Sequence, residues 1–309
     1  MVIHLKELLL SELRGDSDYK PTKCIQKIMH FFIIIKIKIC YRFFIFLNLL
    51  GCLYMAITIK TKEQIEILRA AGKHHARILT ELESLIIPGV TALELNKAAE
   101  QKVRSIGAEP SFLNYQPDHT YPLYPASLCV SINNEVVHGI PTAEMIIQNG
   151  DIVSIDLGLE YKGLFTDSAR TVFVGDVSDE KKQLVYDTRE ALMLGIAAAQ
   201  NGNTVGDIGY AIESFNNKRY GNVKELSGHG VGIAVHEDPY VPNFGKQGHG
   251  AKLKPGMVIA IEPMFNLGTS DVVFHDDGYT VSTRDGSISA HVEHTVLITE
   301  NGPEILTEL

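Results

Sequence analysis

Four carboxylates and one imidazole, each set in a short apolar segment, are the residues of this chain best suited to chemistry. A carboxylate is costly to bury unless positive charge compensates it, so acids inside such segments predict a cluster around cations. A set rich in oxygen with a single nitrogen suits Mn, Fe(II) or Co(II) better than a thiolate zinc site would. The predicted metal ligands are Asp156, Asp167, His229, Glu262 and Glu293.

The first two acids lie in alternating runs, GDIVSIDLGL and LFTDSARTVFVG, that are joined by a short connection. A two-residue turn formed by Tyr161 and Lys162 predicts an antiparallel hairpin in which Asp156 lies directly opposite Asp167, with Cβ atoms about 5 Å apart. Two carboxylates so placed repel each other unless cations lie between them. The alternative, that one acid faces solvent at a sheet edge, is weakened by the three further ligand types downstream.

The other three predicted ligands have equally informative surroundings. His229 lies between glycines, which let the backbone fold tightly around the imidazole. Glu262 ends an apolar run and precedes a proline, which keeps it extended. Glu293 interrupts the alternating strand predicted over residues 290–296. Acids in such places contradict the local pattern, and such inconsistencies tend to mark function.

Composition limits the classes of protein that need to be considered. A chain of 309 residues with 45% hydrophobic residues can form one large domain or two with a full core. The net charge of −9 argues against a nucleic-acid-binding surface. The charge is uneven, because residues 1–54 contain eight Lys or Arg and only four Asp or Glu.

Residues 1–54 are predicted to form a hydrophobic, basic extension ahead of a domain over residues 55–309. Within it, residues 24–57 form an apolar zone broken by a few basic side chains. Its longest charge-free piece is at the lower limit for crossing a bilayer. Three interpretations stay open: a weak membrane anchor, an arm packed on the body, or upstream sequence ahead of an internal start at Met55. We favour the last, so membrane association would depend on retention of residues 24–57.

Cysteine usage favours a reducing compartment, and therefore the cytoplasm. Three of the four cysteines lie in the extension, and Cys129 is the only one after it, so no disulfide can form within residues 55–309. No CxxC pair occurs, which excludes a thiolate zinc module.

Two helix pairs look like copies of one another. Helices are predicted from about Thr61, from Thr91, over 179–200 and from about Thr204, and strands over 128–137 and 152–174. Residues 89–100 and 202–213 share a Gly-x-Thr start followed by an acid, an aliphatic, Ala and Glu at the same offsets. In each half a predicted strand follows, with a histidine near its end. This histidine is His138 in the first half and His236, in the strand predicted over 231–236, in the second. We therefore predict a pseudosymmetric α+β domain with the metal cluster at its centre.

At these residues the chain resembles the type I methionine aminopeptidases, a metallopeptidase family with the pita-bread fold. The resemblance covers about residues 55–309 and rests on the motifs SINNEVVHGIP, DIVSIDLG, GLFTDSARTVFVG, LSGHGVGIAVHEDP, LKPGMVIAIEPM and HVEHT. It implies an α+β fold of two pseudosymmetric halves around a central antiparallel sheet. The spacing of 31 residues between Glu262 and Glu293 leaves no room for the helical insertion typical of type II enzymes.

The resemblance also implies roles for particular residues. The five predicted ligands would bind two divalent ions, from among Co, Mn, Fe(II) and Zn, and Glu262 would also take a proton from the attacking water. His138 and His236 would contact the substrate and act in catalysis. The substrate's methionine side chain would be received by Tyr124, Cys129 and Tyr279. Tyr279 stands where Trp is common in the family, and Val235 replaces a larger aromatic, so the shape of this pocket differs from the family pattern.

The expected activity is removal of the N-terminal methionine from nascent proteins and peptides by two-metal-assisted hydrolysis. The resemblance implies nascent polypeptides as partners and raises docking on the ribosome, with a monomer as the default state. Two rivals stay open: an Xaa-Pro metalloexopeptidase of the same fold, which would use the same ligands, and a non-catalytic binding scaffold. Most of the other histidines, among them His291, are expected to be surface or structural residues, whereas His294, beside Glu293, is a candidate to support the metal ligands.

Overall fold

The computed structural model describes residues 57–309, and Met55–Leu309 forms one compact unit. The apolar zone over residues 24–57 therefore lies outside the described residues except for its last position, and none of its three interpretations is tested. Among residues 57–309, no helix combines the length and the apolar character needed to cross a bilayer.

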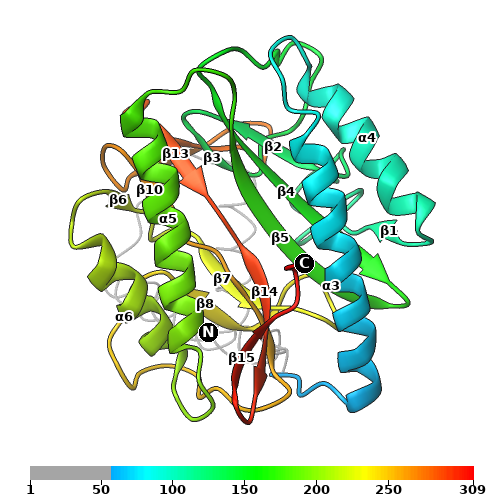
Figure 1. Cartoon of the computed structure of the whole chain (residues 1–309), viewed down its shortest axis with the longest axis vertical. Coiled ribbons are helices and arrows are strands. Elements are labelled where there is room, and N and C mark those ends of the chain that lie inside the picture. Colours follow the sequence, from blue (N-terminus) through cyan, green and yellow to red (C-terminus); the bar gives the residue numbers. More distant parts are fainter. Residues whose placement is uncertain (1–56) are drawn as a thin grey trace, which may run out of the picture. The chain divides into compact units, whose positions relative to one another are not determined.

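The described part of the chain contains four helices, and they begin where the sequence predicts (Figure 1). They are α3 (Lys62–Glu83), α4 (Ala92–Ser105), α5 (Asp179–Ala198) and α6 (Val205–Asn216). Thr61 and Thr91 form capping boxes with the residues three positions later, which satisfies backbone N–H groups that the first helical turn leaves free. The predicted helix starts are confirmed because capping is a local property of the sequence.

Within residues 57–309, the strands form four antiparallel sheets. One sheet contains β1 (Glu109–Pro110), β2 (Cys129–Ile132), β4 (Ile152–Tyr161) and β5 (Leu164–Phe173). A five-stranded sheet contains β7 (Ser227–Gly230), β8 (Glu237–Pro242), β9 (Val258–Ile261), β14 (His294–Thr299) and β15 (Gly302–Ile305). Two smaller sheets contain β6 (Gly221–Asn222), β10 (Met264–Asn266) and β13 (Ser289–His291), and β3 (Glu135–Val137), β11 (Val272–Phe274) and β12 (Val281–Thr283).

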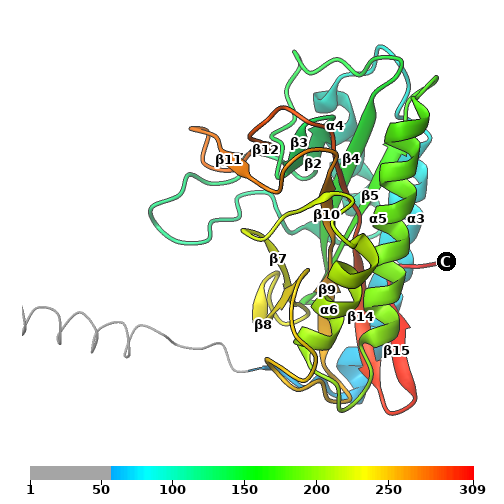
Figure 2. The same ribbon diagram turned by 90° about the vertical axis from the view of Figure 1, so that its left-hand side faces the viewer.

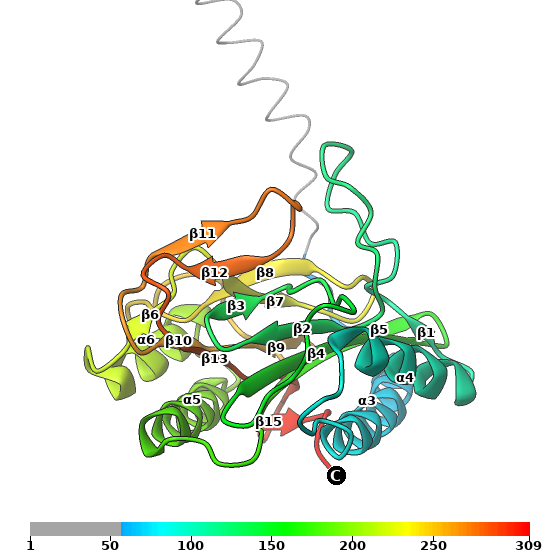
Figure 3. The same ribbon diagram turned by 90° about the horizontal axis from the view of Figure 1, so that it is seen from above.

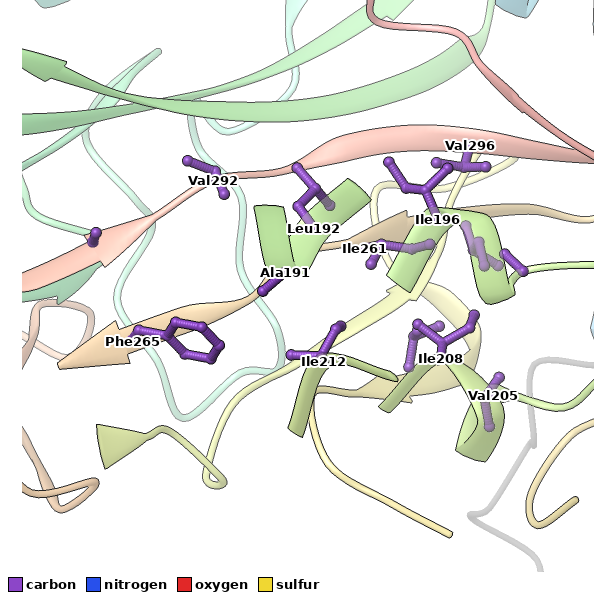
Figure 4. Close-up of a cluster of buried hydrophobic side chains, with 14 of the residues drawn as sticks. Ala191, Leu192, Ile196, Val205, Ile208, Ile212, Ile261, Phe265, Val292 and Val296 are labelled. Atoms are coloured by element: carbon purple, nitrogen blue, oxygen red, sulfur yellow. The ribbon is translucent and has the colours of Figure 1, made fainter. Parts of the chain in front are cut away.

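The long helices α3 and α5 lie on the same face of the strands, whereas β8, β11 and β12 lie on the opposite side (Figures 2 and 3). Each half has its own hydrophobic core under its helices. In the second half, Leu192 and Ile196 of α5 pack with Ile208 and Ile212 of α6 and with Ile261 of β9 (Figure 4). Full burial of one such side chain stabilises a fold by about 1.5–3 kcal/mol, so these cores fix the strands that carry the candidate site.

Matching backbone hydrogen bonds confirm that the two halves are copies. In the first half the N–H of Gly89 donates to the carbonyl of Ile147 at 2.8 Å. In the second half the N–H of Gly202 donates to the carbonyl of Leu253 at 3.0 Å. The isolated bridges Thr91 to Ile146 and Thr204 to Lys252 continue the correspondence. Counted from these anchor points, Asp156 in the first half occupies the position of Glu262 in the second.

One predicted strand is wrong. Residues 231–236 contain no strand, and β8 begins only at Glu237. This stretch is an irregular loop that holds its shape through contacts with segments distant in the sequence, including the hydrogen bond from the N–H of Phe165 to the carbonyl of Gly232, at 2.9 Å. Alternating apolar residues alone do not reveal such contacts.

Candidate metal centre

The hairpin of β4 and β5 carries the first two predicted ligands, but in a different register from the one predicted. Its turn residues are Lys162 and Gly163, which both have positive φ (54° and 80°), as the tight turn of a two-residue hairpin requires. Asp156 therefore pairs with Ala169, so the predicted direct opposition of Asp156 and Asp167 is wrong.

The two acids converge nevertheless. The register differs by two residues, and because side chains alternate between faces, Asp156 and Asp167 still project from the same face of the hairpin. Carboxylate oxygens of Asp156, Asp167 and Glu293 all lie within 4.8 Å of one another. The predicted convergence therefore survives the corrected register.

The remaining predicted ligands come from the second half and from the junction between the halves. His229 lies in β7, and Glu262 directly follows β9. Glu293 lies in a break between β13 and β14, not inside a continuous strand as predicted. Its N–H donates to the carbonyl of Ala169 in β5, at 3.0 Å, which turns the chain toward the hairpin.

His229 joins the two groups of acids. Its Nε2 atom lies 3.6 Å from Oε1 of Glu262 and 3.8 Å from Oδ2 of Asp167. Ligand atoms of His229, Glu262 and Glu293 form a second group within 4.8 Å of one another. The Nδ1 atom of His229 lies 2.9 Å from the carbonyl oxygen of Gly230, so Nδ1 carries the proton and Nε2 presents a lone pair to the acids.

The electrostatics of the cluster fit bound cations. Burial raises the pKa of Asp156 to about 6 and that of Glu262 to about 7. Burial and the neighbouring acids hold the pKa values of Asp167 and Glu293 well above their usual range. One oxygen each of Asp156, Asp167 and Glu293 is buried without a hydrogen-bond partner. Within residues 57–309, no Lys or Arg forms an ion pair with these acids, so divalent cations would supply the missing positive charge.

The two predicted catalytic histidines flank this cluster. His138 directly follows β3 and has φ of +60°, an uncommon conformation for a residue other than glycine. His236 directly precedes β8, and its ring centroid lies 4.3 Å from that of His229. Loss of hydration, together with neighbouring imidazoles, lowers the pKa of His138 to about 4 and that of His236 well below its usual range. Both rings are therefore neutral near pH 7.

An apolar cluster adjoins the acids. Its buried members are Phe112, Tyr124, Ala126, Cys129 and Val235, and Tyr279 packs against them. Cys129 in β2 pairs with Asp156 in β4, so this cluster begins on the strand next to the first ligand. The Tyr279 ring lies 5.0 Å from that of Tyr124, and the Tyr279 hydroxyl lies within hydrogen-bond distance of the carbonyls of Tyr115 and Pro122. The structure therefore brings together all the residues expected to bind the substrate side chain.

Two residues near the cluster were not predicted to belong to the site. His291, expected to be structural or on the surface, is buried with its Nε2 atom 3.6 Å from Oε2 of Glu262. Tyr115 places its hydroxyl 2.7 Å from Nδ1 of His236. His291 could have been found from the sequence, because it lies two residues before Glu293 in an alternating segment. No local pattern indicates Tyr115.

A pseudosymmetric α+β domain with acids and histidines gathered between its halves is the arrangement of a metallopeptidase with the pita-bread fold. The sequence profile of metallopeptidase family M24 matches residues 66–300. The methionine aminopeptidase of Aquifex aeolicus is 46% identical over 261 residues, which cover 82% of this chain and all of that protein. Methionine aminopeptidase 1 of Bacillus subtilis is 42% identical, over 82% of this chain and all of that protein.

Solved structures agree with these relatives. The crystal structure of methionine aminopeptidase from Thermotoga maritima has a TM-score of 0.78 and 42% identity, over 82% of this chain and all of that one. An Xaa-Pro dipeptidase from Bacillus anthracis has a TM-score of 0.66 and 25% identity, over 84% of this chain but only 64% of that one. The chain therefore belongs to metallopeptidase family M24 and, within it, to the methionine aminopeptidases. The predicted family and fold class are confirmed.

Proposed function

We propose that this protein removes the N-terminal methionine of polypeptides by hydrolysis, with two divalent metal ions held by Asp156, Asp167, His229, Glu262 and Glu293. The observation that carries the proposal is the pairing of Cys129 with Asp156 on neighbouring strands. It sets an apolar cluster directly beside buried acids that lack compensating protein charge. Such a site suits a substrate with one apolar end residue and a peptide bond close to it.

The ions, when bound, would make the attacking water more acidic and polarise the substrate carbonyl. Glu262 is the proton acceptor of the proposal, because its carboxylate lies inside the cluster, with Oε1 3.6 Å from Nε2 of His229, within reach of a water held there. This carboxylate would take a proton from the water and give it up to the departing amine.

His236 is assigned to the scissile bond. Burial raises the pKa of the Tyr115 hydroxyl to about 12, so this hydroxyl keeps its proton, and we assign it as the donor to Nδ1 of His236, 2.7 Å away. The proton of the neutral imidazole is then on Nε2, which is free to donate to the developing oxyanion or to the amide being cut. His138, at the equivalent end of the first half, is assigned to contact with the substrate from the other side.

The apolar cluster is assigned to the methionine side chain, with Tyr124, Cys129 and Tyr279 as its binding residues. Cys129 is buried, and burial with the charge of Asp156 raises the pKa of its thiol well above the usual range. The thiol therefore stays neutral and acts as a small apolar surface.

The remaining proposals concern the catalytic domain, the identity of the ions, the partners and the location of the protein. Residues 55–309 are assigned as the catalytic domain, and the ions as two of Mn, Fe(II), Co or Zn. Nascent polypeptides that begin with methionine are the proposed partners, with docking on the ribosome as a further one. We expect a cytoplasmic monomer. The resemblance to methionine aminopeptidases supports these assignments, as does the donor set of four carboxylates and one imidazole.

The test is hydrolysis of Met-Ala-Ser by the purified full chain, followed by methionine release, before and after chelation and reloading with Mn(II). We expect release that disappears with chelator and returns with the ion. Asp167→Asn tests the role of this residue as a metal ligand. The amide keeps the shape of the carboxylate but not its charge, so kcat should fall by roughly a hundredfold or more. Equal or faster cleavage of an Xaa-Pro peptide would reverse the substrate assignment, and metal uptake without any hydrolysis would favour the scaffold.

A further inference from the structure

A buried ion pair lies next to the candidate catalytic histidine. The Nζ atom of Lys60 lies 2.8 Å from Oε2 of Glu237, and both side chains are only 1% exposed. Lys60 precedes α3, whereas Glu237 opens β8 and directly follows His236 in the chain. Desolvation of two charges offsets most of their attraction, so a fully buried pair is poorly explained by stability alone.

The Glu237 carboxylate also holds the loop over residues 231–236. Its Oε1 atom accepts hydrogen bonds from the backbone N–H groups of Ile233 and Ala234, the second at 3.0 Å. Its Oε2 atom accepts from Lys60 and from the hydroxyl of Thr58. Both oxygens are therefore used, one toward the loop and the other toward the segment that precedes α3.

Charge balance keeps this carboxylate ionised. Burial acts to raise the pKa of Glu237, but the hydrogen bonds from Lys60 and Thr58 and the charge of Lys60 outweigh it, and the pKa lies below its usual value. An ionised carboxylate binds backbone N–H groups about twice as strongly as a neutral one.

The loop and the segment before α3 are packed against each other. Gly232 has φ of +132°, and a Cβ atom at this position would lie 2.5 Å from Cε of Lys60. The N–H of Lys60 donates to the carbonyl of Gly256 at 2.8 Å. The positive φ favours glycine at position 232, and its missing side chain leaves room for that of Lys60.

We propose that the Lys60–Glu237 pair is a positioning device for His236. Residues 231–236 form no strand or helix, so the carboxylate of Glu237 restrains the backbone that presents the imidazole. Without this restraint, the 2.7 Å contact between Nδ1 of His236 and the Tyr115 hydroxyl would loosen, and the Nε2 proton would no longer be aimed at the substrate. This inference rests on the proposed role of His236 in peptide hydrolysis.

The test replaces the pair by apolar side chains, Lys60→Met with Glu237→Leu, in the full chain. This double variant removes the restraint without leaving a buried unpaired charge, so the protein should stay folded. We expect kcat for Met-Ala-Ser to fall about 10- to 100-fold. KM and Mn(II) binding by calorimetry should change little, and the imidazole ¹⁵N signals of His236 in the chelated protein should shift or broaden.

A second ion pair provides the control. Arg69 of α3 pairs with Glu304 of β15, at 2.7 Å, and Arg69→Met with Glu304→Leu should leave kcat and the His236 signals as in the wild type. If the Lys60 and Glu237 double variant does not fold, Thr58→Val removes one hydrogen bond to Glu237 and should lower kcat roughly two- to fivefold.

Wild-type kcat and unchanged His236 signals in the folded variant would overturn the positioning role. A folded variant that loses kcat and Mn(II) binding together, while its His236 signals stay unchanged, would overturn it as well, because that pattern is expected of a pair that only stabilises the fold. The imidazole signals are read without substrate or metal, so they test the inference independently of activity. Failure of the wild type to release methionine would refute the proposed function instead.

Discussion

His291 points its Nε2 atom at Oε2 of Glu262 across 3.6 Å, and neither ring nitrogen of His291 has a hydrogen-bond partner within the described residues. The distance is slightly longer than a hydrogen bond, so a small rotation of the carboxylate would close it. Burial lowers the pKa of His291, which leaves one N–H to donate when the imidazole is neutral. His291 is thus placed to orient the acid to which we assign proton transfer.

Removal of this donor should slow the reaction. We expect His291→Leu to lower kcat for Met-Ala-Ser about 10- to 100-fold, because the Glu262 carboxylate loses the side chain that orients it. His291→Gln keeps an N–H donor and should retain most of the activity. Steady-state kinetics at saturating Mn(II) would distinguish them, and equal activity of the Leu variant and the wild type would exclude an orienting role.

Tyr115→Phe should weaken catalysis through His236. The ring stays, with its centroid 5.1 Å from that of His236, but the hydroxyl that we assign as the donor to Nδ1 is lost. The proton of His236 is then no longer confined to Nε2, and we expect kcat to fall about tenfold with unchanged metal content. Tyr220→Phe is the control, since the Tyr220 hydroxyl bonds Asp187 away from the cluster. Equal losses in the two variants would contradict the account.

Enlargement of the apolar cluster residue beside Asp156 should impair substrate binding. Cys129→Leu fills space that we assign to the methionine side chain, so KM for Met-Ala-Ser should rise roughly tenfold. Cys129→Ala leaves that space open and should have a smaller effect. The comparison of KM for the two variants is the measurement, and an unchanged KM for the Leu variant would place the methionine side chain elsewhere.

The raised pKa values make a prediction about the chelated protein. The usual pKa values are about 3.9 for Asp and 4.3 for Glu, whereas the folded protein raises Asp156 to about 6 and Glu262 to about 7. Between pH 4 and 7 the folded state therefore binds more protons than the unfolded state. As pH rises through this window, the free energy of unfolding contributed by these groups should fall, by on the order of 2–3 kcal/mol for each of the two.

Denaturant unfolding of the chelated protein at pH 5 and pH 7 would measure this effect. Asp167→Asn cannot acquire the charge, so the chelated variant should be more stable than the chelated wild type at pH 7. Saturation with Mn(II) should remove or invert the dependence in the wild type. A chelated wild type that gains stability between pH 5 and pH 7, while Asp167→Asn does not, would contradict the assignment of buried, uncompensated acids.

The sequence was sufficient to predict which five side chains converge and where the helices begin, for a physical reason. A carboxylate such as Asp156 contradicts the apolar pattern around it, and a cap such as Thr61 or Thr91 acts within four residues. Both are local signals. The copies around residues 89 and 202 also depend on short patterns, and their matching hydrogen bonds confirm them.

What the sequence did not reveal depends on contacts between distant residues. The register of the β4–β5 hairpin follows from positive φ at Lys162, which no pattern specifies. The break in the strand before β14 follows from the hydrogen bond of Glu293 to Ala169. Lys60 and Glu237 are 177 residues apart, so only the fold shows that they form a pair.

The central claim is that the buried acids and His229 form a site for two divalent ions that hydrolyses the bond after an N-terminal methionine. Its most direct test is a titration of the chelated full chain with Mn(II), with ion binding and methionine release from Met-Ala-Ser followed on the same sample. The account predicts no release without the ion, and release that rises with occupancy until two ions are bound per chain. Release that is undiminished in the fully chelated protein, or full occupancy without any release, would contradict it.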